Sequence, residues 1–394
     1  MSTLLPHPPS PGPGRGPAGP APAPGGPLCL RDIERAAAAV LPPDVWDFVM
    51  GGSGTESSVH ANLAAFEQLY VVPRVLRDVS GCSTASPLLG RSAAAPLAVA
   101  PMAYHRLVHP DGELAVARAA REAGVPFVTG TLSSHPLEEI AAQGARLWLQ
   151  LYWLKDEARL FDLVARAEEA GCEALMLTVD LPWMGRRLRD VRNGFVLPQD
   201  VRAAHLGDGA ASLAHDHRAR SSAVAEHTRA AMTAALSWEH VERLRSRTGL
   251  RLVLKGVLDP RDARQAAEHG VDAVVVSNHG GRQLDGAVPP MAVLGEVRDA
   301  VGERCEVLLD GGVRTGTDIL KALALGASGV LVGRPVFWGL ATEGQAGVGS
   351  VLRLLTEELR DALGLAGCDS VTAARSLRVL TPAPFRDVCA PAAG

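Results

Sequence analysis

The chain has 394 residues and a formal net charge of −4, and 47% of its residues are hydrophobic although only 4% are aromatic. This length and composition predict a globular protein with one large core or at most two domains, and the lack of basic clusters argues against a nucleic-acid partner. The six cysteines are scattered without a CxxC motif and no apolar run approaches the length of a membrane span, so we expect a reduced, cytoplasmic protein without a membrane segment.

The two ends of the chain differ in composition from the rest. Residues 1–28 are rich in proline, glycine and alanine, as in PGPGRGPAGPAPAPGGP. They lack the apolar segment of a signal peptide and the periodicity of a helix. We therefore expect a disordered N-terminal tail over 1–28, one folded domain over 29–381 and a short C-terminal tail over 382–394.

From residue 97 onward, eight short apolar segments alternate with amphipathic helical segments such as GELAVARAAREAG and TGTDILKALALGA. The apolar segments are rich in leucine and β-branched residues without polar alternation, which is typical of strands buried on both faces. Eight such units predict an α/β fold, a (β/α)8 TIM barrel with an N-terminal helical extension. An open, doubly wound sheet is the alternative. The expected strands cover residues 97–100, 126–130, 147–151, 174–179, 252–255, 273–277, 306–310 and 329–333.

The connection between the fourth and fifth strands is unusually long, at about seventy residues. Polar, glycine-containing loops of this length are often active-site lids, so we expect a lid here. The pair His215 and His217 raises the possibility of a metal site, but exposed loop histidines are far commoner than metal ligands, and we expect no metal.

Polar or ionisable residues stand at the ends of nearly all the expected strands. Active sites of TIM barrels lie at the carboxyl ends of the strands, so this pattern predicts a catalytic mouth at that face. The strand-end residues, polar and apolar together, are Pro101, Met102, Ala103, Gly130, Gln150, Tyr152, Thr178, Asp180, Lys255, Ser277, His279, Asp310 and Arg334.

The last two strand ends have the composition of phosphate-binding loops. DGGVRTGTDI follows the seventh strand and VGRPV follows the eighth, which is where this fold usually binds phosphate. Glycine backbone N–H groups at a helix N-terminus favour an anion, and arginines add charge-assisted contacts. The expected phosphate residues are Gly311, Gly312, Arg314, Gly333 and Arg334.

The remaining rim residues suggest acid–base chemistry on a carboxylate substrate. His279 with Asp180 could form a base held in one tautomer by a carboxylate, and Arg187 with Arg282 could bind a substrate carboxylate. Lys255 ends an apolar strand, where its charge requires an anionic partner. The alternative reading is structural, with Asp180 and Arg187 forming a salt bridge and His279 a satisfied rim residue.

Segments of this sequence resemble the signature of the FMN-dependent α-hydroxy acid oxidase and dehydrogenase family, in order and in spacing. The resemblance covers about residues 30–379, and SNHGGRQLD is its most specific motif. A flavin isomerase or a phosphate-binding barrel without flavin would lack that motif. The matching segments are QLYWLKD, LTVDLPWMGRRLRDVRNGF, LVLKGV, VSNHGGRQLDG, DGGVRTGTDILKALALGA and VGRP.

The resemblance implies FMN as cofactor and a role for each matching residue. His279 would be the active-site base and Asp180 would stabilise its protonated form. Arg187, Arg282 and Tyr152 would bind the substrate, and Lys255 would sit where negative charge develops on the reduced flavin. The other expected flavin contacts are Pro101, Met102, Ala103, Gly130, Gln150, Thr178, Ser277, Asp310, Gly311, Gly312, Arg314, Gly333 and Arg334.

The chain also departs from the family pattern near the substrate. Phe48 stands where short-chain oxidases have a tyrosine, Gly130 replaces a common serine, and Leu132 replaces an aromatic residue. With Met102, Tyr104 and Met184, Phe48 and Leu132 predict an aryl pocket.

The expected reaction is therefore oxidation of an aromatic (S)-2-hydroxy acid of the 4-hydroxymandelate type to the 2-oxo acid, with O₂ reduced to H₂O₂. Ala103 follows the oxidase tendency of the family. A dehydrogenase, or an oxidase of longer-chain, carrier-bound or peptide-bound hydroxy acids, is the alternative. Family relatives are usually tetramers, so the resemblance also implies a homotetramer.

Overall fold

The computed structural model of the chain describes residues 26–206, 214–215 and 222–380. Most of the expected N-terminal tail, the whole of the expected C-terminal tail and His217 of the considered metal pair lie outside these residues. No helix in the described part of the chain is long and apolar enough to cross a membrane.

Eight parallel strands close into a barrel in the order β10-β11-β4-β5-β6-β7-β8-β9, and each matches one of the apolar segments of the sequence. The predicted (β/α)8 barrel is confirmed, and the alternative of an open sheet is wrong. The strands are β4 Leu97–Val99, β5 Phe127–Gly130, β6 Leu147–Leu151, β7 Ala174–Thr178, β8 Arg251–Val257, β9 Ala273–Val276, β10 Glu306–Asp310 and β11 Gly329–Val332.

The barrel interior is a packed core that is separate from the core between strands and helices. Each strand contributes one or two side chains to it, from Ala98 and the large Trp148 to Leu331, and Leu88 and Leu89 join the same cluster. These two leucines belong to a hairpin of β2 (Ser86–Leu88) and β3 (Arg91–Ala93). Apolar side chains therefore fill the inside of the barrel, as TIM barrels require.

Helices surround the barrel, and local sequence determines where several of them begin and end. Asp156 and Asp259 cap α6 and α11 with their side chains, and Thr315 begins α13 with a capping box. The long α14 is kinked at Glu343 and Gly344. The helices are α4 Gly112–Ala123, α5 Leu137–Ala141, α6 Glu157–Glu169, α10 Trp238–Arg245, α11 Pro260–Glu268, α12 Pro290–Val301, α13 Gly316–Ala324 and α14 Arg334–Leu365.

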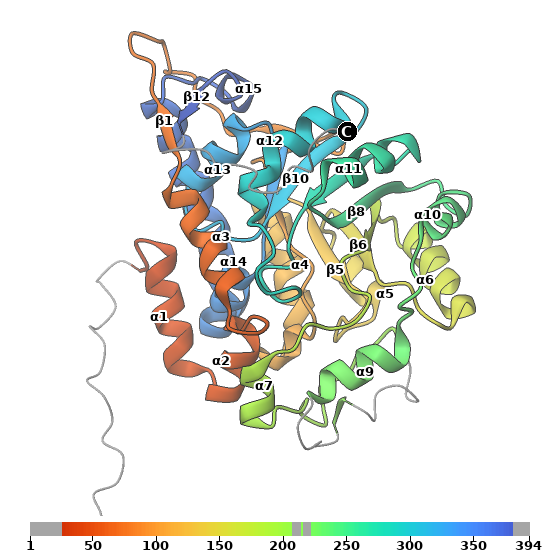
Figure 1. Cartoon of the computed structure of the whole chain (residues 1–394). Helices are drawn as coiled ribbons and strands as arrows, with labels where there is room; N and C mark the ends of the chain where they lie inside the picture. The colour runs from red at the N-terminus through yellow and green to blue at the C-terminus, as the bar shows by residue number, and fades with distance from the viewer. Residues whose placement is uncertain (1–25, 207–213, 216–221, 381–394) are drawn as a thin grey trace, which may run out of the picture.

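An N-terminal helical extension precedes the barrel, as the sequence predicted. It consists of α1 (Leu30–Val40), α2 (Pro43–Met50) and α3 (Ser57–Glu67), and α1 and α2 pack against α14 (Figure 1). The strand β1 (Tyr70–Val72) then pairs antiparallel with β12 (Arg378–Leu380), close to the short α15 (Val371–Ala374). This pairing connects the segment after the N-terminal extension to the C-terminal end of the described chain.

The long connection between β7 and β8 carries α7 (Leu188–Asn193), α9 (Ala223–Ala231) and α10. Figure 1 shows α7 and α9 together at one end of the molecule, with α7 next to α2. Near α4, the one-turn helix η1 (His105–Leu107) follows β4. The connection therefore places α7 against the N-terminal extension, which matters for the site below.

Candidate active site

A cavity of about 1250 Å³, open to solvent, lies at the carboxyl ends of the barrel strands. This volume includes the solvent-filled space at its open mouth. Most of the residues predicted from sequence line it: Phe48, Pro101, Met102, Ala103, Gly130, Leu132, Gln150, Tyr152, Thr178, Met184, Arg187, Lys255, His279, Arg282, Asp310, Gly311, Gly312, Arg314, Gly333 and Arg334.

Three predicted residues lie behind the cavity wall rather than on it: Asp180, Ser277 and Tyr104. Asp180 and Ser277 hold wall residues in place, as described below. Tyr104 was expected to line an aryl pocket, but its side chain is fully buried and its hydroxyl has no hydrogen-bond partner among the described residues. Its backbone is left-handed (φ 59°), and its N–H donates to the Leu132 carbonyl oxygen at 3.0 Å. With this backbone conformation, the Tyr104 side chain lies in the core behind the cavity wall and not on the cavity surface.

His279 and Asp180 form a directly bonded pair at the cavity. Nδ1 of His279 lies 2.9 Å from Oδ1 of Asp180, and the His279 backbone N–H donates to Oγ of Ser277 at 3.0 Å. His279 has a left-handed φ of 59°, a conformation that costs energy for a residue with a side chain. Asp180 is accommodated by Gly256, where an added Cβ would lie 2.5 Å from the carboxyl carbon. Three features thus set the orientation of the imidazole: the left-handed backbone of His279, the hydrogen bond with Asp180, and the space that Gly256 leaves for Asp180.

This pairing also has an electrostatic consequence. Burial alone would raise the pKa of Asp180, but His279 and Lys255 lower it below its ordinary value. Asp180 is therefore ionised at neutral pH. A permanent carboxylate on Nδ1 leaves Nε2 as the nitrogen through which His279 can accept a proton.

Lys255, near the end of β8, contacts residues at the ends of two other strands, Ser277 after β9 and Asp310 at the end of β10. Its Nζ lies 2.8 Å from Oδ2 of Asp310 and donates to Oγ of Ser277 at 3.0 Å. Burial favours the neutral amine, but Asp310 and Asp180 raise the pKa of Lys255 above its ordinary value, so the buried side chain is charged. Oδ1 of Asp310 is buried without a partner among the described residues and can accept a further hydrogen bond.

Two arginines face an aromatic ring on the side of the mouth near α2 and α7. The guanidinium carbons of Arg187 and Arg282 lie 5.8 and 5.4 Å from the centroid of Phe48, which stacks on Phe195 at 4.6 Å. Burial, and then the neighbouring Arg282, lower the pKa of Arg187 to about 9. Since neither arginine forms an ion pair within the described residues, this side of the mouth is suited to an organic anion.

Two further arginines stand at the predicted phosphate loops. Arg334 donates to three carbonyl oxygens, those of Val49 (3.2 Å), Gly280 (3.0 Å) and Gly51 (3.1 Å), and Arg314 lies over the Trp338 ring at 5.0 Å. Burial, and then the other arginines of the mouth, lower the pKa of Arg334 well below its ordinary value. Such a cluster of like charges favours an anion, and α13 begins beside it, with Thr315 as its N-cap.

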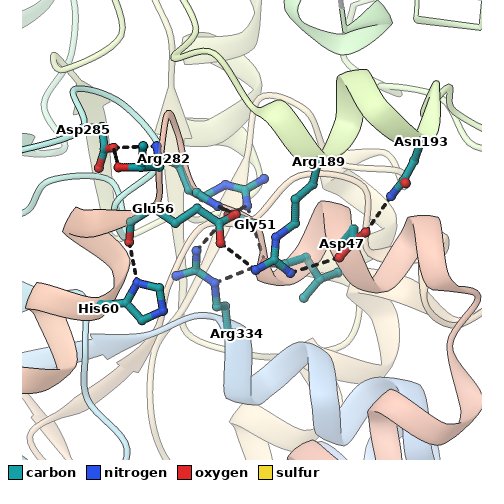
Figure 2. A network of polar contacts seen from close by, with 12 residues as sticks. Asp47, Gly51, Glu56, His60, Arg189, Asn193, Arg282, Asp285 and Arg334 are labelled. Carbon is teal, nitrogen blue, oxygen red and sulfur yellow. Dashed lines mark hydrogen bonds and ion pairs between the residues drawn. The ribbon is translucent and has the colours of Figure 1, made fainter.

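The segment between α2 and α3 connects these two anion-binding regions. Figure 2 shows Arg282 and Arg334 converging on the Gly51 carbonyl oxygen, which accepts a hydrogen bond from each. Asp285 fixes the following turn by accepting from the N–H and hydroxyl of Thr55 at 2.7 and 2.8 Å. The GGSGTE segment thus contacts Arg282 on the Phe48 side of the mouth and Arg334 at the phosphate loops.

Several cavity residues were not predicted from the sequence. Some of the additional wall residues, such as Val224 and Thr228 on α9, come from segments without a motif, whereas Leu181, Gly280 and Val313 lie inside the quoted motifs without having been assigned to the site. Phe195 and the buried Asp190, which follows Arg187 on α7, lie within the RRLRDVRNGF segment that the sequence analysis singled out only for Arg187. The unpredicted wall residues include Val49, Leu181, Val224, Thr228 and Phe337.

The closed barrel, the cavity lined by arginines and the His279–Asp180 pair are together suited to a TIM-barrel enzyme that takes anionic ligands. A family model described as FMN-dependent dehydrogenase matches residues 37–380. The chain belongs to this family: it is an FMN-dependent enzyme that oxidises 2-hydroxy acids.

Individual relatives agree with this assignment. The chain is 61% identical over 348 residues to 4-hydroxymandelate oxidase of Amycolatopsis orientalis, which covers 88% of this chain and 97% of the relative. It is 42% identical to 2-hydroxyacid oxidase 1 of Homo sapiens, covering 87% and 94%. The crystal structure of mandelate oxidase with (S)-4-hydroxymandelic acid superposes with a TM-score of 0.88 at 59% identity, covering 90% of this chain and 99% of that one.

Proposed function

We propose that the protein oxidises an aromatic (S)-2-hydroxy acid, with (S)-4-hydroxymandelate as the first candidate, to the 2-oxo acid, and that O₂ takes the electrons and becomes H₂O₂. The relatives support this choice, since one is a 4-hydroxymandelate oxidase and a similar structure contains that acid. The wall residues Phe48, Leu132 and Met184 offer an aromatic ring an apolar surface. The observation that carries the proposal is the His279–Asp180 pair beside Arg187 and Arg282, which form no ion pair among the described residues and have Asp190 only as a more distant acidic neighbour.

The described residues fit FMN. Asp310 offers a buried acceptor oxygen without a partner, suited to the ribityl hydroxyls, and Arg314 and Arg334 would hold the phosphate with the backbone of the glycines around them. Lys255 would place its charge at the pyrimidine part of the ring. When bound, FMN supplies the redox chemistry by accepting the two electrons that leave the substrate. The remaining ring contacts would come from Pro101, Met102, Ala103, Gly130, Gln150, Thr178 and Ser277.

His279 would remove a proton from the substrate through Nε2, because Nδ1 is engaged by Asp180 at 2.9 Å. A positioned base of this kind contributes roughly 10²–10⁴-fold to the rate. Asp180 would stabilise the imidazolium that forms, as its lowered pKa keeps it ionised. Arg187 and Arg282 would bind the substrate carboxylate, and Tyr152 would donate a hydrogen bond to the substrate, since burial raises its pKa to about 12 and keeps it protonated.

An absorption spectrum of the purified protein tests this proposal, followed by anaerobic addition of (S)-4-hydroxymandelate. We expect flavin bands that bleach with this acid and return with air, with H₂O₂ formed in equal amount to the 2-oxo acid. The (R)-enantiomer and (S)-lactate serve as comparisons. His279→Asn should keep the flavin bands but not bleach.

Each other outcome corrects a different part of the proposal. Flavin that does not bleach would refute the substrate and favour longer-chain or carrier-bound hydroxy acids. Bleached flavin that air does not restore, but an artificial acceptor does, would indicate a dehydrogenase. Absence of flavin even after reconstitution would refute the assigned cofactor. The domain limits of 29–381, a homotetramer and a cytoplasmic location remain predictions, and sedimentation of the holoenzyme checks the tetramer.

A further inference from the structure

Arg189 makes a set of contacts that neither the cofactor nor the substrate explains. It lies on α7, two residues after Arg187, which is the N-cap of that helix. Its guanidinium donates from Nη1 to Oδ1 of Asp47 at 3.0 Å and from Nη2 to Oε2 of Glu56 at 2.6 Å (Figure 2). Asn193, one turn further along α7, donates to the other oxygen of Asp47 at 2.6 Å. Three hydrogen bonds thus connect α7 to α2 and to the loop after it.

Asp47 and Glu56, the two acids that accept hydrogen bonds from Arg189, lie on either side of Phe48 and Gly51, which contact the arginines of the cavity. Asp47 immediately precedes Phe48, the ring that faces Arg187 and Arg282. Glu56 accepts the backbone N–H of Gly52 through Oε1 at 3.0 Å, next to the Gly51 carbonyl that Arg282 and Arg334 share. Arg189 therefore links the helix of Arg187 to the backbone that fixes Arg282.

Arg187 has few contacts of its own that would fix its side chain. Its side chain is buried, its Nε has no hydrogen-bond partner among the described residues, and it forms no ion pair there. A buried guanidinium with so few partners is held by the helix that carries it. Because α7 has only six residues, its placement depends on contacts with neighbouring elements rather than on intrinsic helix stability.

We propose that Arg189 is a positioning residue: by bridging Asp47 and Glu56 it sets Arg187 and Arg282 at the separation that binds the substrate carboxylate. This inference rests on the proposed function, since it assumes that the two arginines bind that carboxylate. The bridge is charged at neutral pH, because burial tends to raise the pKa of Glu56 but Arg189 and the Gly52 N–H lower it. Arg189 does not line the cavity and acts only through the elements it joins.

The test is the binding of phenylacetate, an aryl carboxylate without a hydroxyl to oxidise, to the oxidised holoenzyme by calorimetry and by perturbation of the flavin spectrum. Arg189→Met keeps most of the side-chain length and removes the bridge. We expect its Kd to rise about tenfold, the loss of one charge-assisted interaction. In steady-state turnover of the hydroxy-acid substrate, KM should rise by a similar factor while kcat changes less than about threefold. Arg189→Lys can reach only one of the two acids at a time. Its Kd for phenylacetate should therefore lie between those of the unmodified protein and Arg189→Met.

A matched control removes an equally well bonded arginine at the opposite end of the barrel. Arg146, just before β6, donates to both carboxylate oxygens of Glu173 before β7, at 2.9 and 2.8 Å. Arg146→Met should lower stability and leave the Kd for phenylacetate unchanged. Glu56→Gln combined with Arg189→Met should weaken binding no further than Arg189→Met alone, since both substitutions break one bridge.

Two results would overturn the inference. One is a Kd of Arg189→Met within twofold of the unmodified protein, and the other is an equal loss in Arg146→Met, which would mark a general effect of instability. A holoenzyme that does not bind phenylacetate at all would overturn it too, because no carboxylate site would be left to position. If 4-hydroxymandelate is not oxidised but phenylacetate binds, the proposed substrate fails while the Arg189 comparison still decides this inference.

Discussion

Phe48 is the wall residue at which we expect a single substitution to change the choice of substrate most directly. It faces Arg187 and Arg282 and stacks on Phe195, so its ring is fixed while its para position carries no polar group. Phe48→Tyr adds a hydroxyl that can bind a carboxylate, worth a net ~0.5–1.5 kcal/mol. We expect the ratio of kcat/KM for (S)-lactate over (S)-4-hydroxymandelate to rise about two- to tenfold, measured by steady-state oxidation of both acids.

The comparison needs a control on the aromatic stack itself. Phe195→Leu removes the stacking partner without adding a polar group, and it should loosen Phe48 without favouring lactate. A substrate ratio that stays constant in Phe48→Tyr would mean that the ring does not contact the substrate side of the arginines. A ratio that rises equally in Phe195→Leu would assign the effect to loosened packing.

Individual residues also show where sequence reasoning ended. The residues at strand ends were predictable, because a parallel barrel delivers every carboxyl end to one mouth. Tyr104 stands just beyond a strand end as well, yet its side chain is buried behind the wall. Arg189 was not predicted, since its partners Asp47 and Glu56 lie far away in sequence and no local pattern signals such a contact.

At the scale of elements, the eight strands were predictable from their continuous apolar runs, whereas two other pairings were not. Strand β1 is exposed along much of its length and pairs with β12, from the other end of the described chain. The β2–β3 hairpin has three residues per strand, too few to show a period. These short strands depend on tertiary contacts, which a local reading of the chain does not contain.

The loop between β10 and α13 offers an element-scale prediction, because its backbone packs tightly against α3. Gly312 has a φ of +97°, and a Cβ there would lie 2.3 Å from the carbonyl oxygen of Asn62. Gly312→Ala must therefore move the loop away from α3, which displaces Arg314 and the start of α13. We expect the purified variant to retain less than about a tenth of the flavin of the unmodified protein, measured as the ratio of flavin to protein absorbance.

Gly295 provides the matched control for this substitution. It lies inside α12, and an added Cβ would meet no atom within 4 Å. Gly295→Ala should keep full flavin content and gain about 0.4–1 kcal/mol of stability, as alanine restricts the unfolded chain. Full flavin content in Gly312→Ala would show that this loop does not shape the phosphate site.

For the whole molecule, the four arginines of the mouth should make stability depend on a bound anion. Arg187 is buried, Arg282, Arg314 and Arg334 are half-buried around the same cavity, and burial followed by the neighbouring arginines lowers the pKa of Arg334 well below its ordinary value. Each is thus held in the folded chain at an electrostatic cost that a phosphate and a carboxylate would relieve. The protein stripped of FMN should be less stable than the holoenzyme, and FMN at 100 times its Kd should restore about 2.7 kcal/mol.

Riboflavin separates the phosphate from the ring in this prediction, because it has the same isoalloxazine and ribityl groups and no phosphate. If Arg314 and Arg334 bind the phosphate, riboflavin should bind at least about tenfold more weakly than FMN and raise the melting temperature less at equal concentration. Added salt should narrow the difference only slightly, as buried charges are poorly screened. Equal stabilisation by riboflavin and FMN would place the phosphate in solvent, and Arg314 before α13 and Arg334 at the start of α14 would then need another anion to account for their clustering.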